Sequence, residues 1–107
     1  MISYEAVALK IQEIEAELKR LGRWMPESPP PEAFENMGPF GMNTMAPEQW
    51  LQFVLIPRVN EIIAAKGEFP AADSIAAYFV KNLDGDEQAG PLCRLIIEFN
   101  SLFDENP

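Results

Sequence analysis

The stretch WLQFVLIPR at positions 50–58 decides the fold, because it is almost wholly apolar yet ends in a proline and an arginine. Its apolar residues leave almost no polar face, and a helix that is apolar on all sides lies at the centre of a bundle. Pro57 has no N–H to donate to the carbonyl of Phe53, so the sequence predicts a kink between these two residues. Arg58 follows on the less apolar half of the helix.

Flanking residues set the length of this helix. Thr44 is suited to cap its start, and Pro47 fits the first turn, where the amide that proline lacks would be unpaired. The pattern predicts a helix over residues 47–65 that stops near Gly67.

A second helical pattern covers residues 4–21, where apolar residues recur at alternating steps of three and four. Ser3 is suited to cap its start and Gly22 its end, because glycine adopts the left-handed conformation without a side-chain penalty. Glu15 and Lys19 are spaced for an ion pair of ~0.3 kcal/mol on the solvated face. The buried stripe consists of Tyr4, Val7, Ile11, Ile14, Leu18 and Leu21.

Two further helices follow in the C-terminal half. One begins at Pro70 or Asp73 and ends near Leu83; the other covers residues 91–104, after a polar turn at 84–90. No stretch alternates with period two, so no strand is expected. The prediction is an all-α four-helix bundle with a long proline-rich connection between its first two helices, forming one domain over residues 1–107.

The connection at 23–46 contains five of the ten prolines, so no long helix can run through it, although a short helical turn is expected at 32–36. Its aromatic and methionine content predicts a collar that lies back over the bundle, either as a roof for the core or as a binding surface. The candidate binding residues are Trp24, Phe34, Phe40, Met42, Met45, Trp50 and Arg58.

Arg58 has two interpretations. In the structural one, its guanidinium reaches an acid such as Glu98 or Glu61, or carbonyls of the collar. In the functional one, it holds a carboxylate or phosphate in a pocket beneath residues 24–46, which would make the protein a small-molecule carrier or enzyme.

Charge and composition exclude several classes of function. The net charge of -9 disfavours direct binding to nucleic acid, and no apolar run is long enough to span a membrane. A single cysteine and no secretory signal predict the reducing cytoplasm. Three basic residues cluster where the first helix is expected to end: Lys19, Arg20 and Arg23. Positive charges at the C-terminal end of a helix interact favourably with its dipole, so this cluster has a structural explanation.

Catalytic constellations are scarce in this sequence. It has no histidine, which removes the commonest general base and metal ligand. Cys93 lies between core positions and is expected to be an inert thiol. Asp84, Asp86 and Glu87 do not complete a calcium loop, because Leu95 stands where the last acidic ligand is required. Neither enzymatic activity nor a metal or cofactor is expected.

The segment PFGMNTMAPEQWLQFVLIPR at 39–58 resembles the signature of the YqcC-like family of small bacterial proteins. The resemblance extends over nearly the whole chain and implies an all-helical bundle. Members are often labelled by association with tRNA pseudouridine synthase C, whose catalytic aspartate lies in a larger mixed α/β domain, so the resemblance supplies no catalytic residue here.

These observations favour a non-enzymatic module that binds a protein partner, accessory to tRNA pseudouridine synthase C. An acidic surface favours a basic partner, and a tRNA-modifying enzyme qualifies. The narrow apolar stripe at 4–21 also leaves room for a homodimer.

Overall fold

The computed structural model describes residues 3–35, 44–67 and 75–104, and all regular structure within them is helical. The predicted all-α four-helix bundle is therefore confirmed. The elements are α1 (Tyr4–Arg20), the 3-10 turn η1 (Pro31–Phe34), α2 (Pro47–Trp50), the π-helical turn η3 (Leu51–Leu55), α3 (Ile56–Ala65), α4 (Ile75–Asn82), the 3-10 turn η4 (Glu87–Ala89) and α5 (Gly90–Asp104). The elements α2, η3 and α3 follow one another without a break and form the second helix of the bundle.

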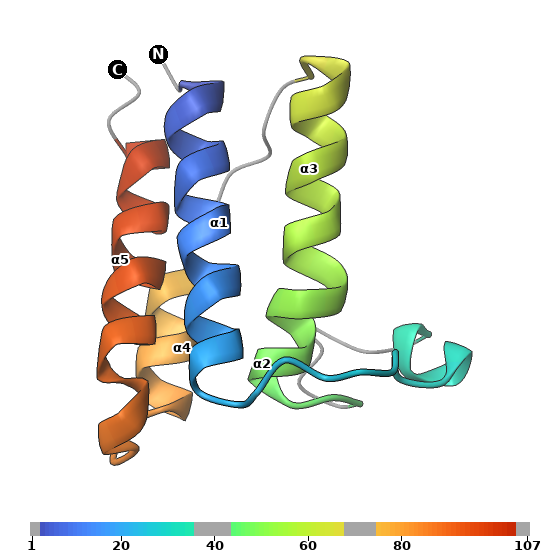
Figure 1. The fold of residues 1–107 in the computed structure, drawn as a ribbon, viewed down its shortest axis with the longest axis vertical. Helices are drawn as coiled ribbons and strands as arrows, with labels where there is room; N and C mark the ends of the chain where they lie inside the picture. The colour runs from blue at the N-terminus through green and yellow to red at the C-terminus, as the bar shows by residue number, and fades with distance from the viewer. Residues whose placement is uncertain (1–2, 36–43, 68–74, 105–107) are drawn as a thin grey trace.

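The helix at the centre of the bundle is α1. It lies between α5 and α3 and contacts both, while α4 packs against α5 (Figure 1). The prediction that the helix at 47–65 is central is wrong, because that helix stands at one side of α1. Its apolar excess is only partly buried, since Phe53 and Val54 remain half-exposed while Leu51 and Leu55 are buried.

Each of the four helices of the bundle contributes to a single hydrophobic core, the second of them through η3 and α3. The stripe predicted on α1 supplies four of its members, all of them 2% exposed or less. Removing side chains of this size from water is the main favourable term in folding. The core consists of Val7, Ile11, Ile14, Leu18, Leu51, Leu55, Ile56, Val59, Ile75, Phe79, Leu83, Ala89, Leu92, Ile96 and Phe99.

The predicted N-cap of α1 is confirmed, whereas its C-cap residue is Leu21, and Gly22, predicted as the cap, follows in the left-handed conformation. The Ser3 hydroxyl accepts a hydrogen bond from the amide of Ala6 at 3.2 Å. At the other end Gly22 has φ +73°, and the amide of Arg23 donates to the carbonyl of Leu18 at 2.8 Å. This arrangement ends the helix and turns the chain sharply. It thereby directs Arg23 and the residues after it across the end of the bundle.

The start of α2 differs from the prediction. Ala46, rather than Thr44, is the N-cap residue, and its amide donates to the side chain of Gln49 at 2.9 Å. Thr44 lies two residues too early to cap the helix, and its hydroxyl donates to the carbonyl of Ala33. Pro47 occupies the first turn as predicted.

The irregularity predicted before Pro57 takes the form of a π-helical turn. Within η3 the amide of Ile56 donates to the carbonyl of Leu51, five residues back rather than four. Such widened turns break the regular hydrogen-bond ladder of a helix. Because Pro57 cannot donate in the next position, the widened turn lies where that ladder is already interrupted.

The α4 and α5 helices agree with the prediction over their described parts. The predicted start at Pro70 or Asp73 lies outside the described residues, and α4 ends at Asn82. The amide of Ala76 donates to the Asn100 side chain at 3.3 Å, which joins α4 to α5. Within residues 3–35, 44–67 and 75–104, no helix is both long and apolar enough to cross a bilayer.

The end of α3 places a non-glycine residue in the left-handed conformation. Lys66 has φ 54° and ψ 38°, and the amide of Gly67 donates to the carbonyl of Ile62. The helix was predicted to stop near Gly67, but the left-handed position precedes that glycine by one residue. A side chain there costs free energy that glycine would not.

Replacing Lys66 with glycine is therefore expected to raise the free energy of unfolding by about 0.5–1 kcal/mol. Urea denaturation monitored by circular dichroism measures the change. Ala65→Gly is the matched control, because it places glycine in a right-handed helical position and is expected to lower stability by about 1 kcal/mol. Equal destabilisation by both substitutions would contradict this explanation.

Candidate binding site at the lower end of the bundle

The lower end of the bundle is the end where α1 stops and where α2 and α5 begin (Figure 1). There the Arg23 guanidinium contacts two carboxylates from different parts of the chain. Its Nη2 lies 2.6 Å from Asp86 Oδ2, and its Nη1 lies 3.4 Å from Glu48 Oε2. Arg23 and Glu48 are each 21% exposed. The ion pairs join the connection after α1 to the first turn of α2 and to the turn before η4.

Gln52 fixes the same connection from inside the core. Its Oε1 accepts from the amide of Met25, and its Nε2 donates to the carbonyl of Met25, both at 2.8 Å. The side chain therefore pairs with the backbone of Met25 as a neighbouring strand would. Gln52 is 6% exposed and is the buried polar residue within the described segments. Buried polar groups require such partners, because leaving one unpaired costs free energy.

Trp24 lies between these two anchored residues and packs against the core. The Lys19 ammonium lies 5.0 Å from the centroid of the Trp24 ring, close enough for a cation–π contact. Lys19 Nζ also lies 2.9 Å from Glu15 Oε2, so the predicted ion pair is confirmed. Trp24 thus serves as a roof over one part of the core.

A cleft of about 300 Å³ opens beside the Gln52 pairing. We call it the Met25 cleft, because the Met25 side chain is 41% exposed at its edge. Arg23 and Glu48 lie on its wall, already paired with each other. Its lining residues are Gly22, Arg23, Met25, Ala46, Glu48 and Gln49.

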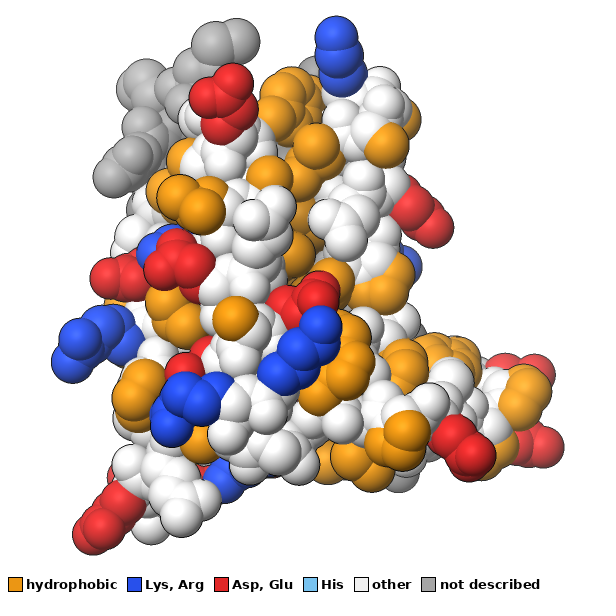
Figure 2. Space-filling view, viewed as in Figure 1, with side chains coloured by type: hydrophobic (Ala, Val, Ile, Leu, Met, Phe, Trp, Pro, Cys, Tyr) orange, Lys and Arg blue, Asp and Glu red, His pale blue; other side chains and the backbone are white. Residues whose placement is uncertain are grey.

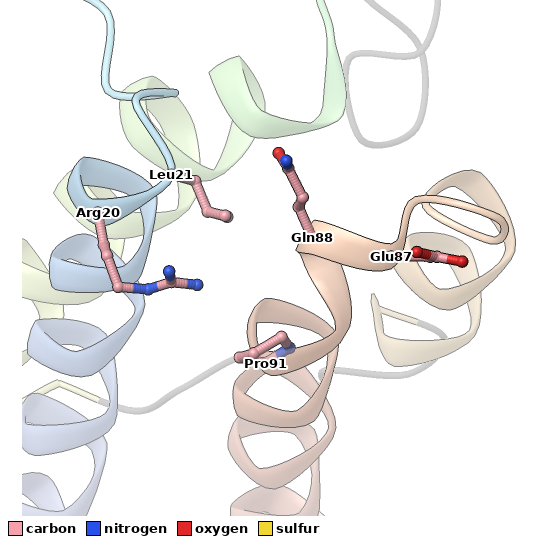
Figure 3. Close-up of a pocket in the computed structure, with 5 residues that line it drawn as sticks. All are labelled: Arg20, Leu21, Glu87, Gln88 and Pro91. Carbon is pink, nitrogen blue, oxygen red and sulfur yellow. The ribbon is translucent and has the colours of Figure 1, made fainter.

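A second cleft of about 360 Å³ lies between the end of α1 and the start of α5. Arg20 and Leu21 point toward η4 and Pro91, whereas Glu87 points away from them (Figure 3). The Arg20 guanidinium donates to Glu17 at 2.8 Å, and this hydrogen bond lowers the pKa of the Glu17 carboxyl. The positive charge in this cleft is therefore already matched by a carboxylate, which disfavours an anionic ligand.

The predicted binding residues that the structure describes do not converge on one site. Trp50 packs against the core with its ring centroid 5.8 Å from that of Phe79, and Met45 is buried. Phe34 is half-buried on η1, which projects sideways from the lower end rather than lying back over the helices (Figures 1 and 2). The predicted collar is therefore wrong for η1. Phe40 and Met42 lie outside the described residues.

Arg58 is exposed on α3 and makes no ion pair or hydrogen bond within the part of the chain that the structure describes. Its predicted pairing with Glu98 is wrong, because Glu98 Oε1 lies 2.9 Å from Lys10 Nζ across the α1–α5 interface. Arg58 lines neither of the two clefts. Arg58 lies in the first turn of α3, and neither of these two clefts contains the Arg58 guanidinium that the predicted anionic-ligand pocket requires.

The roles of two residues at the lower end, Arg23 and Gln52, were not predicted from the sequence. Arg23 was assigned to the dipole of the first helix, but its partners are 25 and 63 residues away in sequence. Gln52 carried a detectable signal, since a single amide within the apolar run at 50–58 requires an internal partner. Neither residue has a spacing that identifies that partner.

Cys93 is half-buried on α5. Burial raises the pKa of its thiol, and the negative charge of Asp86 raises it further. A raised thiol pKa reduces the thiolate fraction, which is the nucleophilic form. The surroundings of Cys93 thus favour an unreactive thiol.

The ion pair of Asp86 makes the stability of the protein depend on pH. Its hydrogen bond with Arg23 holds the pKa of the Asp86 carboxyl below the ordinary value of 3.8. A carboxyl whose pKa is lower in the folded state stabilises the fold above its unfolded pKa and loses that contribution as pH falls through the folded value. The contribution is therefore complete at neutral pH and disappears below about pH 4.

Asp86→Asn is expected to lower stability at neutral pH, and its difference from the wild type should shrink as pH falls below about 4. Thermal or urea unfolding between pH 2.5 and 7 measures both curves. Glu87→Gln removes the same charge from the neighbouring residue. Its stability should still fall with pH below about 4 as that of the wild type does. A constant difference between Asp86→Asn and wild type at all pH values would exclude this role.

Comparisons with known proteins agree with the fold and with the resemblance at 39–58. The chain is 37% identical over 86 residues to the uncharacterised protein YqcC of Escherichia coli K12, covering 80% of this chain and 79% of that protein. It is 25% identical over 96 residues to an uncharacterised protein of Haemophilus influenzae, covering 90% and 91%. The solution NMR structure of Escherichia coli YqcC superposes with a TM-score of 0.85 and 32% identity, over 100% of this chain and 92% of that one.

A further match joins the chain to a longer protein. Over 58 residues it is 36% identical to tRNA pseudouridine synthase C of Pectobacterium carotovorum, covering 54% of this chain and 15% of that protein. The model of the DUF446 family, described as tRNA pseudouridine synthase C, matches residues 6–102. The chain therefore belongs to the DUF446 family, the YqcC-like group of proteins.

Proposed function

We propose that this protein is a non-enzymatic helical module that binds tRNA pseudouridine synthase C and is accessory to it. The module would act through contact with the enzyme rather than through contact with tRNA. The proposal assigns the lower end of the bundle to the interface.

The observation that carries the proposal is the match to the Pectobacterium protein. A protein named tRNA pseudouridine synthase C contains a segment similar to half of this chain, and the segment accounts for 15% of its length. Most of that protein therefore lies outside the segment. A module and an enzyme joined in one polypeptide are held at high effective concentration. When the two are separate chains, a binding interface must keep them together instead.

The charge of the chain supports a protein partner that carries basic residues. A protein that binds tRNA requires Lys and Arg to neutralise phosphates, and such a surface attracts a chain of net charge -9. Opposite charge speeds the encounter of two proteins and orients them. This complementarity favours the synthase over the tRNA as the molecule that is contacted.

The reactive groups of the lower end also support binding rather than catalysis. Arg23 is neutralised by Glu48 and Asp86, and Arg20 by Glu17. The Cys93 thiol has a raised pKa. Side chains that are already paired hold a surface in shape, whereas catalysis requires groups that are poised to exchange protons or charge.

Size-exclusion chromatography with light scattering of the purified chain and the synthase of the same host tests the proposal. We expect a complex whose mass equals the sum of the partners. In parallel, the chain alone should form no pseudouridine in tRNA, and its addition should change the rate or site preference of the synthase. Separate elution of the two proteins together with an unchanged rate would refute the proposal.

A further inference from the structure

We infer that the Met25 cleft receives an apolar side chain from a basic segment of the partner protein. The inference rests on the proposed function and adds to it the position of the contact and the chemistry of the segment that makes it. The observation that supports it is that Met25, which lines an open cleft and is exposed, has its backbone held by two part-buried hydrogen bonds to Gln52.

Met25 has an anchored backbone and an exposed side chain. Both backbone polar groups pair with Gln52 at 2.8 Å, whereas the side chain is 41% exposed. A fixed backbone reduces the conformational entropy that a contact residue loses on binding. The thioether is flexible and polarisable, so it adapts to the shape of an incoming apolar group.

The cleft offers an apolar group space beside that side chain. It has a volume of about 300 Å³, and the apolar residues Ala46 and Met25 are among those that line it. A few side chains that fill recesses of the partner surface supply most of the affinity of a protein interface. A single aliphatic or aromatic side chain is a suitable size for this space.

The surroundings of the cleft are negative. The Arg23 charge is shared between Glu48 and Asp86, which leaves one net negative charge on the three side chains. Glu27 is exposed on the same connection, two residues beyond Met25. Lysine or arginine residues beside the apolar anchor would meet these carboxylates, and an acidic segment would be repelled.

The other exposed large hydrophobic side chains lack this setting. Within the described residues these are Leu9, Val80 and Ile97, which are 59%, 42% and 45% exposed. They lie on α1, α4 and α5, and none of them lines either cleft. Single exposed hydrophobic residues on helices are ordinary features of protein surfaces. Leu9 therefore provides a matched control for Met25.

Titration calorimetry of the synthase with Met25→Arg, Met25→Ala, Leu9→Arg and Leu9→Ala tests the inference. Met25→Arg should weaken binding more than about tenfold, because it fills the cleft and repels basic residues. Met25→Ala should weaken it by about fivefold or more, since the thioether contact is lost. Both Leu9 variants should remain within about twofold of the wild type. Circular dichroism checks that each variant is folded, and Met25→Ala decides the matter if Met25→Arg is not.

The outcomes separate this inference from the proposed function. Absence of binding by the wild type would overturn both. Wild-type binding that Met25→Ala leaves unchanged, or that Leu9→Ala weakens as much, would overturn the inference about the cleft and leave the proposed partner in place.

Discussion

Replacing Gln52 with leucine is expected to lower the free energy of unfolding by about 2–4 kcal/mol. Leucine has a similar volume and is more apolar, so simple burial would predict little loss. The substitution nevertheless leaves the amide and the carbonyl of Met25 without the partners that now lie at 2.8 Å. Each buried polar group without a partner costs about 1–3 kcal/mol. Urea denaturation monitored by circular dichroism measures the loss.

Two further substitutions isolate the cause. Gln52→Glu keeps an acceptor for the Met25 amide but cannot donate to its carbonyl when ionised, so it should be as damaging as leucine. Gln49→Leu removes the side chain that accepts from the Ala46 amide at the exposed start of α2, and should cost about 0.5–1 kcal/mol. If Gln52→Leu cost no more than Gln49→Leu, the pairing would not be what anchors the connection.

Trp50→Ala is expected to lower the free energy of unfolding by about 2–4 kcal/mol. Trp50 is half-buried, packs against the core and faces Phe79 at 5.8 Å between ring centroids. The sequence placed it among the candidate binding residues, where truncation would reduce affinity rather than stability. Thermal unfolding and synthase binding, measured on the same preparation, distinguish the two roles.

Trp50→Phe is the control, because it keeps a ring in contact with Phe79. Its loss of stability should be less than half of the loss caused by Trp50→Ala. Tenfold weaker synthase binding by Trp50→Ala with an unchanged melting temperature would return Trp50 to the binding surface.

The sequence predicted the helices well because their signals are local. The stripe on residues 4–21 identifies both the helix and its buried face, and Ser3 and Gly22 mark its ends. Pro47 and Pro91 also marked the starts of α2 and α5 to within one residue, and Gly67 marked the end of α3 to within two. Each of these signals depends on residues less than two turns apart, which is the range over which helix geometry acts.

The arrangement of the lower end could not be predicted, because it depends on contacts between distant residues. Arg23 meets Asp86 63 positions further along the chain, and Gln52 meets Met25 across 27 positions. Likewise, the apolar excess of residues 50–58 wrongly indicated a central helix. A helix wheel gives the extent of an apolar face but not the number of helices that cover it. Arg58 was misassigned for a related reason, since an ion pair with Glu98 is as plausible from sequence as the one that Glu98 makes with Lys10.

Our central proposal is that this protein binds tRNA pseudouridine synthase C through the acidic surface around the Met25 cleft. Titration calorimetry of the purified chain into the synthase of the same host, at about 50 and 300 mM salt, tests it most directly. We expect saturable binding at one site that weakens several-fold at the higher salt, because opposite charges at the interface are screened. No heat of binding at either salt, with both proteins folded, would contradict it.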